Sequence, residues 1–379
     1  MSSIIILGAG FGGLTAANEL KRLLGDKHAI TLIDKKDNFS VSAMNLWVMI
    51  GKKKPEECAR HIREIESKGI KFVNDTIVRI DTDEKKVFTT TDYYRYDYLI
   101  ISLGAEYAED LIPGFKEMSL NLYDINGSYQ ISQQIEKFYR GKILITIPRL
   151  PIKCPGAPYE TAFLLDSYMK EQGRRSNVTI TICTAEPYPL PSAGKACGNM
   201  MIDMLNSRNI KIIQNAKILA ADKKKSALIL ENGIEEGFDL LIGIPPHFLP
   251  TILKNFADET SWIPVDRQTL KTKFQNVFAI GDSTSIKLSN GMALPKAGVF
   301  AEEEAKIVAD IIACDIDGKK SEKTFDGKGY CFLEIGDNQA AKIVGEFFEP
   351  EPIVEIIPPS KEIFYEKVSF VKRRMDELV

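Results

Sequence analysis

Several features that would mark other classes of protein are missing from this sequence of 379 residues. No apolar run reaches the roughly 20 residues that a transmembrane helix needs, and no basic segment precedes the first apolar stretch, so we expect neither a span nor a secretory signal. The net charge of -3 gives no general positive field, which argues against nucleic acid as a partner. We therefore expect a cytoplasmic protein that is soluble or peripheral on the cell membrane.

Closely spaced metal ligands are also missing. The six cysteines include no pair at CxxC spacing, and the three histidines stand apart from one another, so the sequence predicts no zinc site or other metal centre. Structural disulfides are uncommon in the cytoplasm. A bridge between any two of these cysteines would therefore indicate redox chemistry.

The first 34 residues carry a complete dinucleotide-binding pattern. An apolar run from Ile4 leads into Gly8-Ala-Gly10-Phe-Gly-Gly13 and a helical pattern, and a second apolar run ends at Asp34. Glycines permit a tight turn and the close approach of a pyrophosphate, and an acid about 20 residues farther on binds the adenosine ribose. The pattern predicts a bound dinucleotide that contacts these glycines and Asp34.

Two later apolar runs end at residues that suit the same ligand. One ends at Leu103-Gly104-Ala105 and the other at Gly281-Asp282. Ligands of open α/β sheets lie at the carboxyl ends of strands, where a glycine lets a flavin pass close to the backbone. We expect Asp282 to bond a ribityl hydroxyl. Together with the N-terminal pattern, these residues predict FAD.

A glycine-rich phosphate loop is absent where a second one would be expected. The apolar run from Lys142 is followed by Pro148-Arg-Leu-Pro151 and then by Cys154 before Pro-Gly. A later strand pattern ends at Glu186, in the place of a ribose-binding acid. The sequence thus predicts a second Rossmann-like domain in which a thiol replaces a dinucleotide site.

These patterns predict an α/β fold with two Rossmann-like domains, the first of them split in sequence. We expect the FAD-binding domain in residues 1–115 and 265–320, the second Rossmann-like domain in 116–264, and a C-terminal segment with a redox cysteine in 321–379.

The C-terminal third holds two further helical patterns. Lys296 lies beside the start of the first, where it would favour a reduced, anionic flavin; a solvated lysine is the alternative. In residues 360–379, apolar residues from Phe364 to Leu378 alternate at spacings of four and three, which indicates an amphipathic helix. It would pack on the protein, on a partner subunit of a possible homo-oligomer, or on a membrane surface.

Together these motifs resemble the two-dinucleotide-binding-domain flavoproteins, and within them the sulfide:quinone oxidoreductases and the flavocytochrome c sulfide dehydrogenases. The specific part of the resemblance is Lys153-Cys154-Pro-Gly-Ala-Pro-Tyr-Glu160, Pro295-Lys296-Ala-Gly298, and Cys331-Phe332. It implies that Cys154 and Cys331 form a redox centre at the flavin and that Phe332 contacts quinone. A plain strand position is the alternative for Cys331.

The resemblance has two departures. The third functional cysteine of many sulfide:quinone oxidoreductases has no counterpart in residues 121–134, and Ser40 and Ser42 lie in the segment where the flavocytochrome type attaches FAD through a cysteine. We therefore expect a two-cysteine centre and non-covalent FAD.

The resemblance implies oxidation of sulfide to sulfur or polysulfide, with electrons passed through FAD to a membrane quinone. Glu160 would move protons, with a surface helix cap as the alternative, and Lys153 or Lys296 would stabilise a thiolate. Two other functions stay open: an NAD(P)H-dependent flavin dehydrogenase of the type II NADH:quinone oxidoreductase kind, and a non-catalytic FAD-binding protein.

Overall fold

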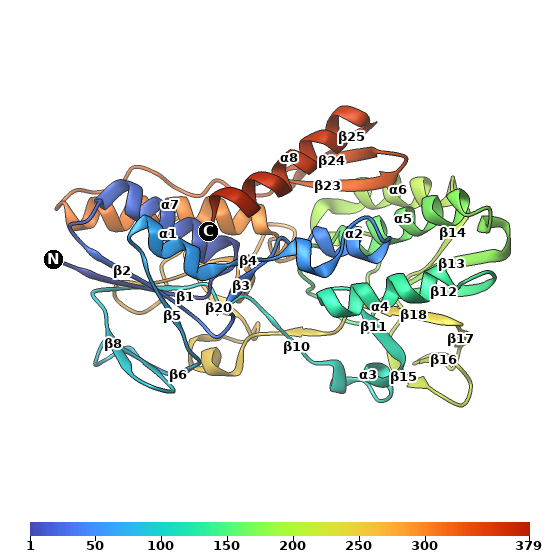
Figure 1. Ribbon diagram of the computed structural model, residues 1–379, viewed down its shortest axis with the longest axis horizontal. Coiled ribbons are helices and arrows are strands. Elements are labelled where there is room, and N and C mark those ends of the chain that lie inside the picture. The colour runs from blue at the N-terminus through green and yellow to red at the C-terminus, as the bar shows by residue number, and fades with distance from the viewer.

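The computed structural model describes all 379 residues, and its first part is a parallel sheet covered on both faces (Figure 1). The strand order is β21-β9-β1-β2-β5. Its central strand is buried from Ile4 to Leu7, as expected for a parallel strand with helices or loops on each side. The strands are β1 (Ser3–Leu7), β2 (Ala29–Asp34), β5 (Lys71–Asn74), β9 (Tyr98–Ile101) and β21 (Val277–Ala279).

Two helices from opposite ends of the sequence pack on this sheet side by side. Helix α1 (Phe11–Leu24) follows the glycine turn, and α7 (Gly298–Ile316) follows Lys296. Their buried residues share one hydrophobic core, so the late segment completes the domain that the N-terminus begins.

In the sequence, the proline at position 55 and the inward spacing of Ile62 and Ile65 predict one helix over residues 55–68, and this prediction is wrong. The segment forms a 3-10 turn (Pro55–Cys58), the short strand β4 (Arg60–His61) and a second 3-10 segment (Ile62–Lys68). Ala59 is extended, at φ -128°, which breaks the helix. Ile62 and Ile65 are both buried, and their spacing of three residues suits the tighter 3-10 repeat.

The second part is another five-stranded parallel sheet, in the order β11-β18-β12-β13-β14. Two parallel sheets of this kind confirm the α/β fold that the sequence predicts. The strands are β11 (Ser119–Asn121), β12 (Gly141–Ile147), β13 (Val178–Thr184), β14 (Ile210–Ile213) and β18 (Leu240–Gly243), and the helices are α4 (Ile125–Glu136), α5 (Ala157–Glu171) and α6 (Gly194–Asn206).

The two parts are joined by a pair of crossing segments. Strand β10 (Glu106–Tyr107) runs antiparallel to β19 (His247–Phe248), and the outgoing and returning chains therefore cross side by side. The minor elements are α2 (Met44–Met49), α3 (Phe115–Met118), β3 (Asn38–Phe39), β6 (Ile77–Asp81), β7 (Lys86–Thr89), β8 (Tyr93–Arg95), β15 (Ile218–Asp222), β16 (Ala227–Leu230), β17 (Glu235–Gly237), β20 (Ile263–Pro264) and β22 (Thr284–Ser285).

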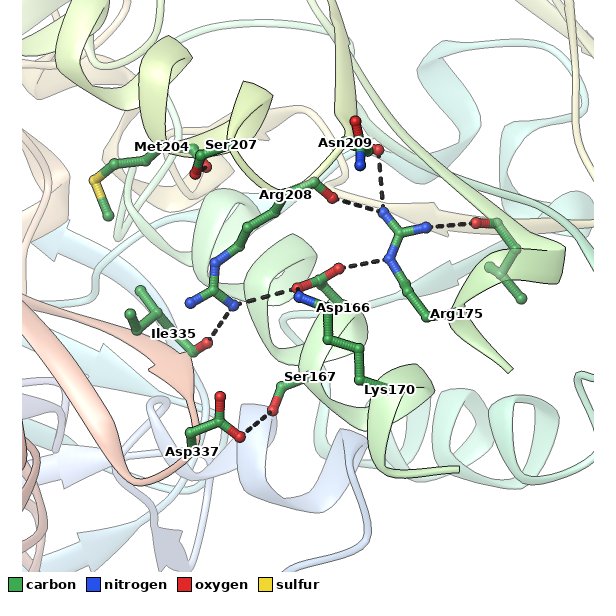
Figure 2. Close-up of polar contacts among 11 residues, drawn as sticks. Asp166, Ser167, Lys170, Arg175, Met204, Ser207, Arg208, Asn209, Ile335 and Asp337 are labelled. Carbon is green, nitrogen blue, oxygen red and sulfur yellow. Dashed lines mark hydrogen bonds and ion pairs between the residues drawn. The ribbon is translucent and has the colours of Figure 1, made fainter. Parts of the chain in front are cut away.

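A C-terminal sheet spans both parts along one side of the molecule (Figure 1). Strands β23 (Lys328–Gly336), β24 (Gln339–Glu346) and β25 (Ile353–Ser360) form an antiparallel meander, and β23 packs on α5. Figure 2 shows the contact at its far end, where Arg208 bonds both the carbonyl oxygen of Ile335 (2.8 Å) and the buried carboxylate of Asp166 (3.3 Å). The C-terminal sheet is thereby attached to the second domain.

The last helix, α8 (Lys361–Glu377), begins at Ser360, whose hydroxyl accepts a hydrogen bond from the backbone N–H of Ile363. Phe370, Val371 and Met375 are buried in the same core as α1 and α7. The predicted amphipathic helix is confirmed, and its apolar face packs on the protein itself. None of the helices has the length and apolar content that crossing a bilayer requires.

Replacing Met375 by alanine should therefore lower the free energy of unfolding by about 2–5 kcal/mol, because the side chain is 5% exposed and truncation leaves a cavity. Urea unfolding followed by circular dichroism measures this change. The exposed Lys372→Ala variant is the control and should stay within about 0.5 kcal/mol of the parent. Equal stabilities for both variants would contradict the packing described for α8.

Candidate active site

One cavity of about 1590 Å³ runs between the two parts of the protein. It begins at the glycine turn after β1, passes the carboxyl ends of β2 and β9, and reaches β23 and α8. Every residue that the sequence singled out for the site lines this cavity except Gly8 and Gly13, which shape the turn at its edge. Segments 300 positions apart thus share one site.

The glycine turn fits a dinucleotide. A Cβ on Gly8, at φ +97°, would clash with the carbonyl oxygen of Ser102, and one on Gly13 would clash with the carbonyl oxygen of Gly8. Gly10, by contrast, faces open space in the cavity, where it leaves room for a phosphate group at the start of α1. Two glycines therefore pack the helix on the strand, and the third opens the backbone to a ligand.

Two carboxylates, those of Asp34 and Asp282, line the part of the cavity that suits FAD. Asp34 accepts hydrogen bonds from the backbone N–H groups of Ala9 (2.7 Å) and Lys36 (2.8 Å), which orient it. Asp282 makes no side-chain hydrogen bond within the protein, and burial raises its pKa. This half-buried carboxylate has no hydrogen-bond donor within the protein, and a ribityl hydroxyl would supply one.

Further positions along this wall have little side chain. Gly104 and Gly281 adopt φ values of +67° and +69°, and both line the cavity beside Ala105. Gly298 begins α7, where a Cβ would lie 3.1 Å from the ring of Phe11. These residues suit the flat ring system of a flavin, and with Gly10, Asp34 and Asp282 they would hold FAD.

Cys154 lies in an unusual backbone turn at the entry to α5. Its φ of +47° is in the left-handed region, which is uncommon for a residue with a side chain. The turn is fixed because its N–H donates to the carbonyl oxygen of Lys296 (2.6 Å) and its carbonyl oxygen accepts from Ala157 N–H (2.9 Å) and from the Tyr123 hydroxyl (3.2 Å). The first domain thus positions a cysteine of the second.

Cys331, on β23, lines the same cavity. A Cβ added to Gly156, two residues after Cys154, would lie 3.5 Å from the sulfur of Cys331. The structure therefore brings the two cysteines, 177 positions apart in the sequence, to the same turn. Both are free thiols. Burial raises the pKa of Cys154 to about 11, and burial with the neighbouring Cys154 raises that of Cys331 further.

Lys296 does not point its charge at this sulfur pair. Its ammonium donates to the carbonyl oxygens of Asp282 (2.7 Å) and Thr284 (2.9 Å) and lies 3.6 Å from the centre of the Trp262 ring. Burial lowers its pKa to about 8. The ammonium of Lys153 lies over the rings of Tyr107 and Tyr123. Burial, the larger effect, raises the pKa of Cys154, and the charge of Lys153 lowers it.

Glu160 belongs to a buried ion cluster. Its carboxylate accepts from the Lys367 ammonium and from the backbone N–H of Glu334 (3.1 Å), and burial raises its pKa although Lys367 opposes this. Lys367 also donates to Glu334 (2.8 Å). The sequence analysis did not identify Lys367 as a residue of the site. Its spacing was a signal, because it precedes Phe370 by three residues and Val371 by four and therefore lies on the inner face of α8.

Phe332 lies at the far end of the cavity in an aromatic cluster with Tyr330 and Phe370, at ring distances of 5.5 and 5.7 Å. The cluster joins β23 to α8, and all three rings line the cavity. Cys183 and Cys197 do not line this cavity and are buried as packing residues in the core of the second domain.

The fold and the cavity define a class of protein. The family model of the pyridine nucleotide-disulphide oxidoreductases matches residues 2–145 and 159–301, and the chain belongs to this FAD-binding family. Within it, the chain is a member of the sulfide:quinone oxidoreductase and flavocytochrome c sulfide dehydrogenase group and is a flavin-dependent oxidoreductase. The model for the central part of the flavocytochrome c sulfide dehydrogenase flavoprotein chain matches residues 129–182.

Individual relatives agree with this assignment. The mitochondrial sulfide:quinone oxidoreductase of Mus musculus is 25% identical over 94% of this chain and 80% of its own length. The crystal structure of the Aquifex aeolicus sulfide:quinone oxidoreductase covers 100% of this chain and 91% of its own, with a TM-score of 0.87 at 23% identity. A type II NADH:quinone oxidoreductase of Staphylococcus haemolyticus is 26% identical over 83% of each chain.

Replacing Asp282 by alanine should weaken FAD binding about 10- to 100-fold, because a charged hydrogen bond contributes about 1.5–3 kcal/mol. The flavin retained per protein during dilution and gel filtration measures this loss. The control is Asp317→Ala at the exposed end of α7, which should retain the parent's flavin. Equal retention by both variants would mean that Asp282 does not contact the cofactor.

Proposed function

We propose that this protein oxidises sulfide to sulfur or polysulfide at Cys154 and Cys331 and passes the electrons through non-covalent FAD to a quinone. The observation that carries the proposal is the shared cavity, whose lining includes both cysteines, the residues suited to FAD and the aromatic cluster. The named relatives, which act on sulfide and quinone, support the same substrates.

In the proposed reaction the two cysteines begin as a disulfide or sulfur-bridged pair. Hydrosulfide attacks one sulfur, the sulfur–sulfur bond breaks, and the products are a persulfide on one cysteine and a thiolate on the other. The proton of hydrosulfide passes to Glu160. When bound, FAD supplies the carrier that takes up the electron pair and one proton.

Glu160 is suited to this proton transfer because it is buried, lines the cavity and has a raised pKa. A carboxyl with a pKa closer to neutrality both takes and releases a proton readily. Lys153, which lies over two tyrosine rings beside Cys154, would assist by stabilising negative charge on that sulfur.

We place the quinone at the aromatic end of the cavity. Tyr330, Phe332 and Phe370 would contact a flat apolar ring, and the buried Lys367, three residues before Phe370 on α8, lines the same cavity and would serve as a hydrogen-bond donor. Few polar groups among aromatic walls are typical of sites for small organic ligands.

A nicotinamide substrate is the rival. The type II NADH:quinone oxidoreductases among the relatives favour it, but the carboxylate of Glu186 accepts from Tyr159, from Thr184 (2.9 Å) and from the N–H of Leu190 (3.2 Å). Because both oxygens of this carboxylate already accept hydrogen bonds within the protein, Glu186 is less available to accept one from a ribose hydroxyl. The absent glycine loop points in the same direction.

Anaerobic rapid mixing separates these functions. Sulfide should bleach the flavin absorbance of the parent protein, and Cys154→Ser and Cys331→Ser should each slow this bleaching at least about 10³-fold, because neither variant can form the sulfur pair. NADH should bleach it slowly or not at all. Rapid bleaching by NADH with none by sulfide would contradict the proposal, and unchanged bleaching in both variants would indicate another route.

We further propose contact with a membrane surface through residues 360–379, using the outer face of α8, because the inner face is buried in the protein's own core. Tyr365, which is 60% exposed, is the large apolar residue on that outer face.

Flotation with liposomes of anionic and neutral lipid tests this contact. Tyr365→Ser should reduce the floating fraction about twofold or more, since one aromatic side chain contributes about 1.5–3 kcal/mol when it leaves water. The Ser369→Ala variant, on an exposed position of the same helix, is the control. Equal flotation of Tyr365→Ser and the parent would remove this role.

A further inference from the structure

A row of charged side chains leads from the cavity to the protein surface behind the cysteines. Glu160 and Lys367 line the cavity, while Glu334 lies behind them and is fully buried. Outermost is Lys52, just after α2, with 43% of its side chain exposed and its ammonium 3.7 Å from Glu334. The row therefore connects solvent with the cavity.

The two oxygens of Glu334 have different surroundings. Oε2 accepts hydrogen bonds from the indole N–H of Trp47 (2.8 Å) and from Lys367 (2.8 Å). Oε1 is buried without a hydrogen-bond partner and faces Lys52. A buried carboxylate oxygen without a donor is uncommon and requires an explanation. Its place between two ammonium groups suits an oxygen that receives a proton transiently.

The proposed function, on which this inference rests, needs such a proton. The overall reaction is hydrosulfide plus quinone plus one proton giving bound sulfane sulfur plus quinol. Oxidation of hydrosulfide releases two electrons and one proton. The bound cofactor would take up all three. Reduction of quinone to quinol takes two electrons and two protons. One proton must therefore come from solvent in the step that reduces quinone.

We propose that Lys52, Glu334 and Lys367 form the path by which this proton enters. Lys52 gives a proton to Oε1 of Glu334 and is reprotonated by water. Lys367 gives its own proton to the quinone that is being reduced. It then takes up the proton held by Glu334. Trp47 holds Glu334 in position through its hydrogen bond to Oε2. After one complete passage of a proton, the charges of the row are as they were at the start.

Rapid mixing tests the path on the FAD-loaded protein. In Lys52→Met, sulfide should bleach the flavin at the parent's rate, whereas a short-chain quinone should restore the colour about 10- to 100-fold more slowly. Ferricyanide, which takes electrons without protons, should restore it at the parent's rate. Lys52→Arg should be as slow as Lys52→Met, because arginine keeps the charge but does not release a proton.

Lys170→Met is the matched control. Lys170 is 54% exposed and pairs with the fully buried Asp166 on α5 (2.8 Å; Figure 2), and neither residue lines the cavity. This variant removes the same kind of ion pair and should change neither reaction. A merely structural effect of the Lys52 variants would slow bleaching by sulfide and recovery with ferricyanide as well.

A second measurement needs no turnover. Burial raises the pKa of Glu334, but Lys367, the Trp47 bond and Lys52 outweigh it and hold this pKa below its usual value. The groups that face Glu334 are these three and Glu160. Lys52→Met should therefore shift the pH midpoint of Trp47 emission upward, while Lys52→Arg and Lys170→Met should not. Trp47→Phe identifies the signal.

Three results would overturn the path: recovery with quinone at the parent's rate in Lys52→Met, recovery restored in Lys52→Arg, or an unchanged midpoint in Lys52→Met. All three would be seen in a protein that sulfide still bleaches. A parent protein that sulfide does not bleach would instead contradict the proposed function itself.

Discussion

The ion cluster of Lys367, Glu160 and Glu334 is the interaction on which the arrangement of the site depends. Its members come from α8, α5 and β23, which belong to the C-terminal helix, the second domain and the C-terminal sheet. Removing one partner from a buried ion pair costs about 3–5 kcal/mol, because a charge is then left without compensation. Three separate parts of the chain are therefore held at one geometry.

That geometry fixes the cysteines. Cys331 lies three residues before Glu334 on β23, and Cys154 lies six residues before Glu160 at the entry to α5. When the two carboxylates share one lysine, the strand and the helix are held together beside the turn that carries Cys154. The bond from Cys154 to the carbonyl oxygen of Lys296 adds the FAD-binding domain to the same assembly. The sulfur pair thus lies where all the parts of the protein meet.

The sequence predicted most of the local structure and few of the tertiary contacts between distant segments. The strand, glycine turn and acid of the first 34 residues form a local pattern, and the structure gives them the expected geometry. Residues 55–68 were misread because buried Ile62 and Ile65 suit a helix and a 3-10 segment equally, and only tertiary packing selects between them. Lys367 was overlooked because a lysine within an amphipathic helix ordinarily faces water.

By itself the sequence determined the α/β fold and the functional groups available to the site. These are glycines and acids suited to FAD, and a thiol in the place of a second phosphate-binding loop. These depend on residues close together in the chain, where short-range geometry decides. Tertiary structure alone brought Cys331 to the turn of Cys154, turned the Lys296 ammonium toward Asp282, and buried Lys367 between two carboxylates. The reason is physical, since such contacts depend on how α5, β23 and α8 pack, and residues 177 positions apart carry no local signal of their distance in space.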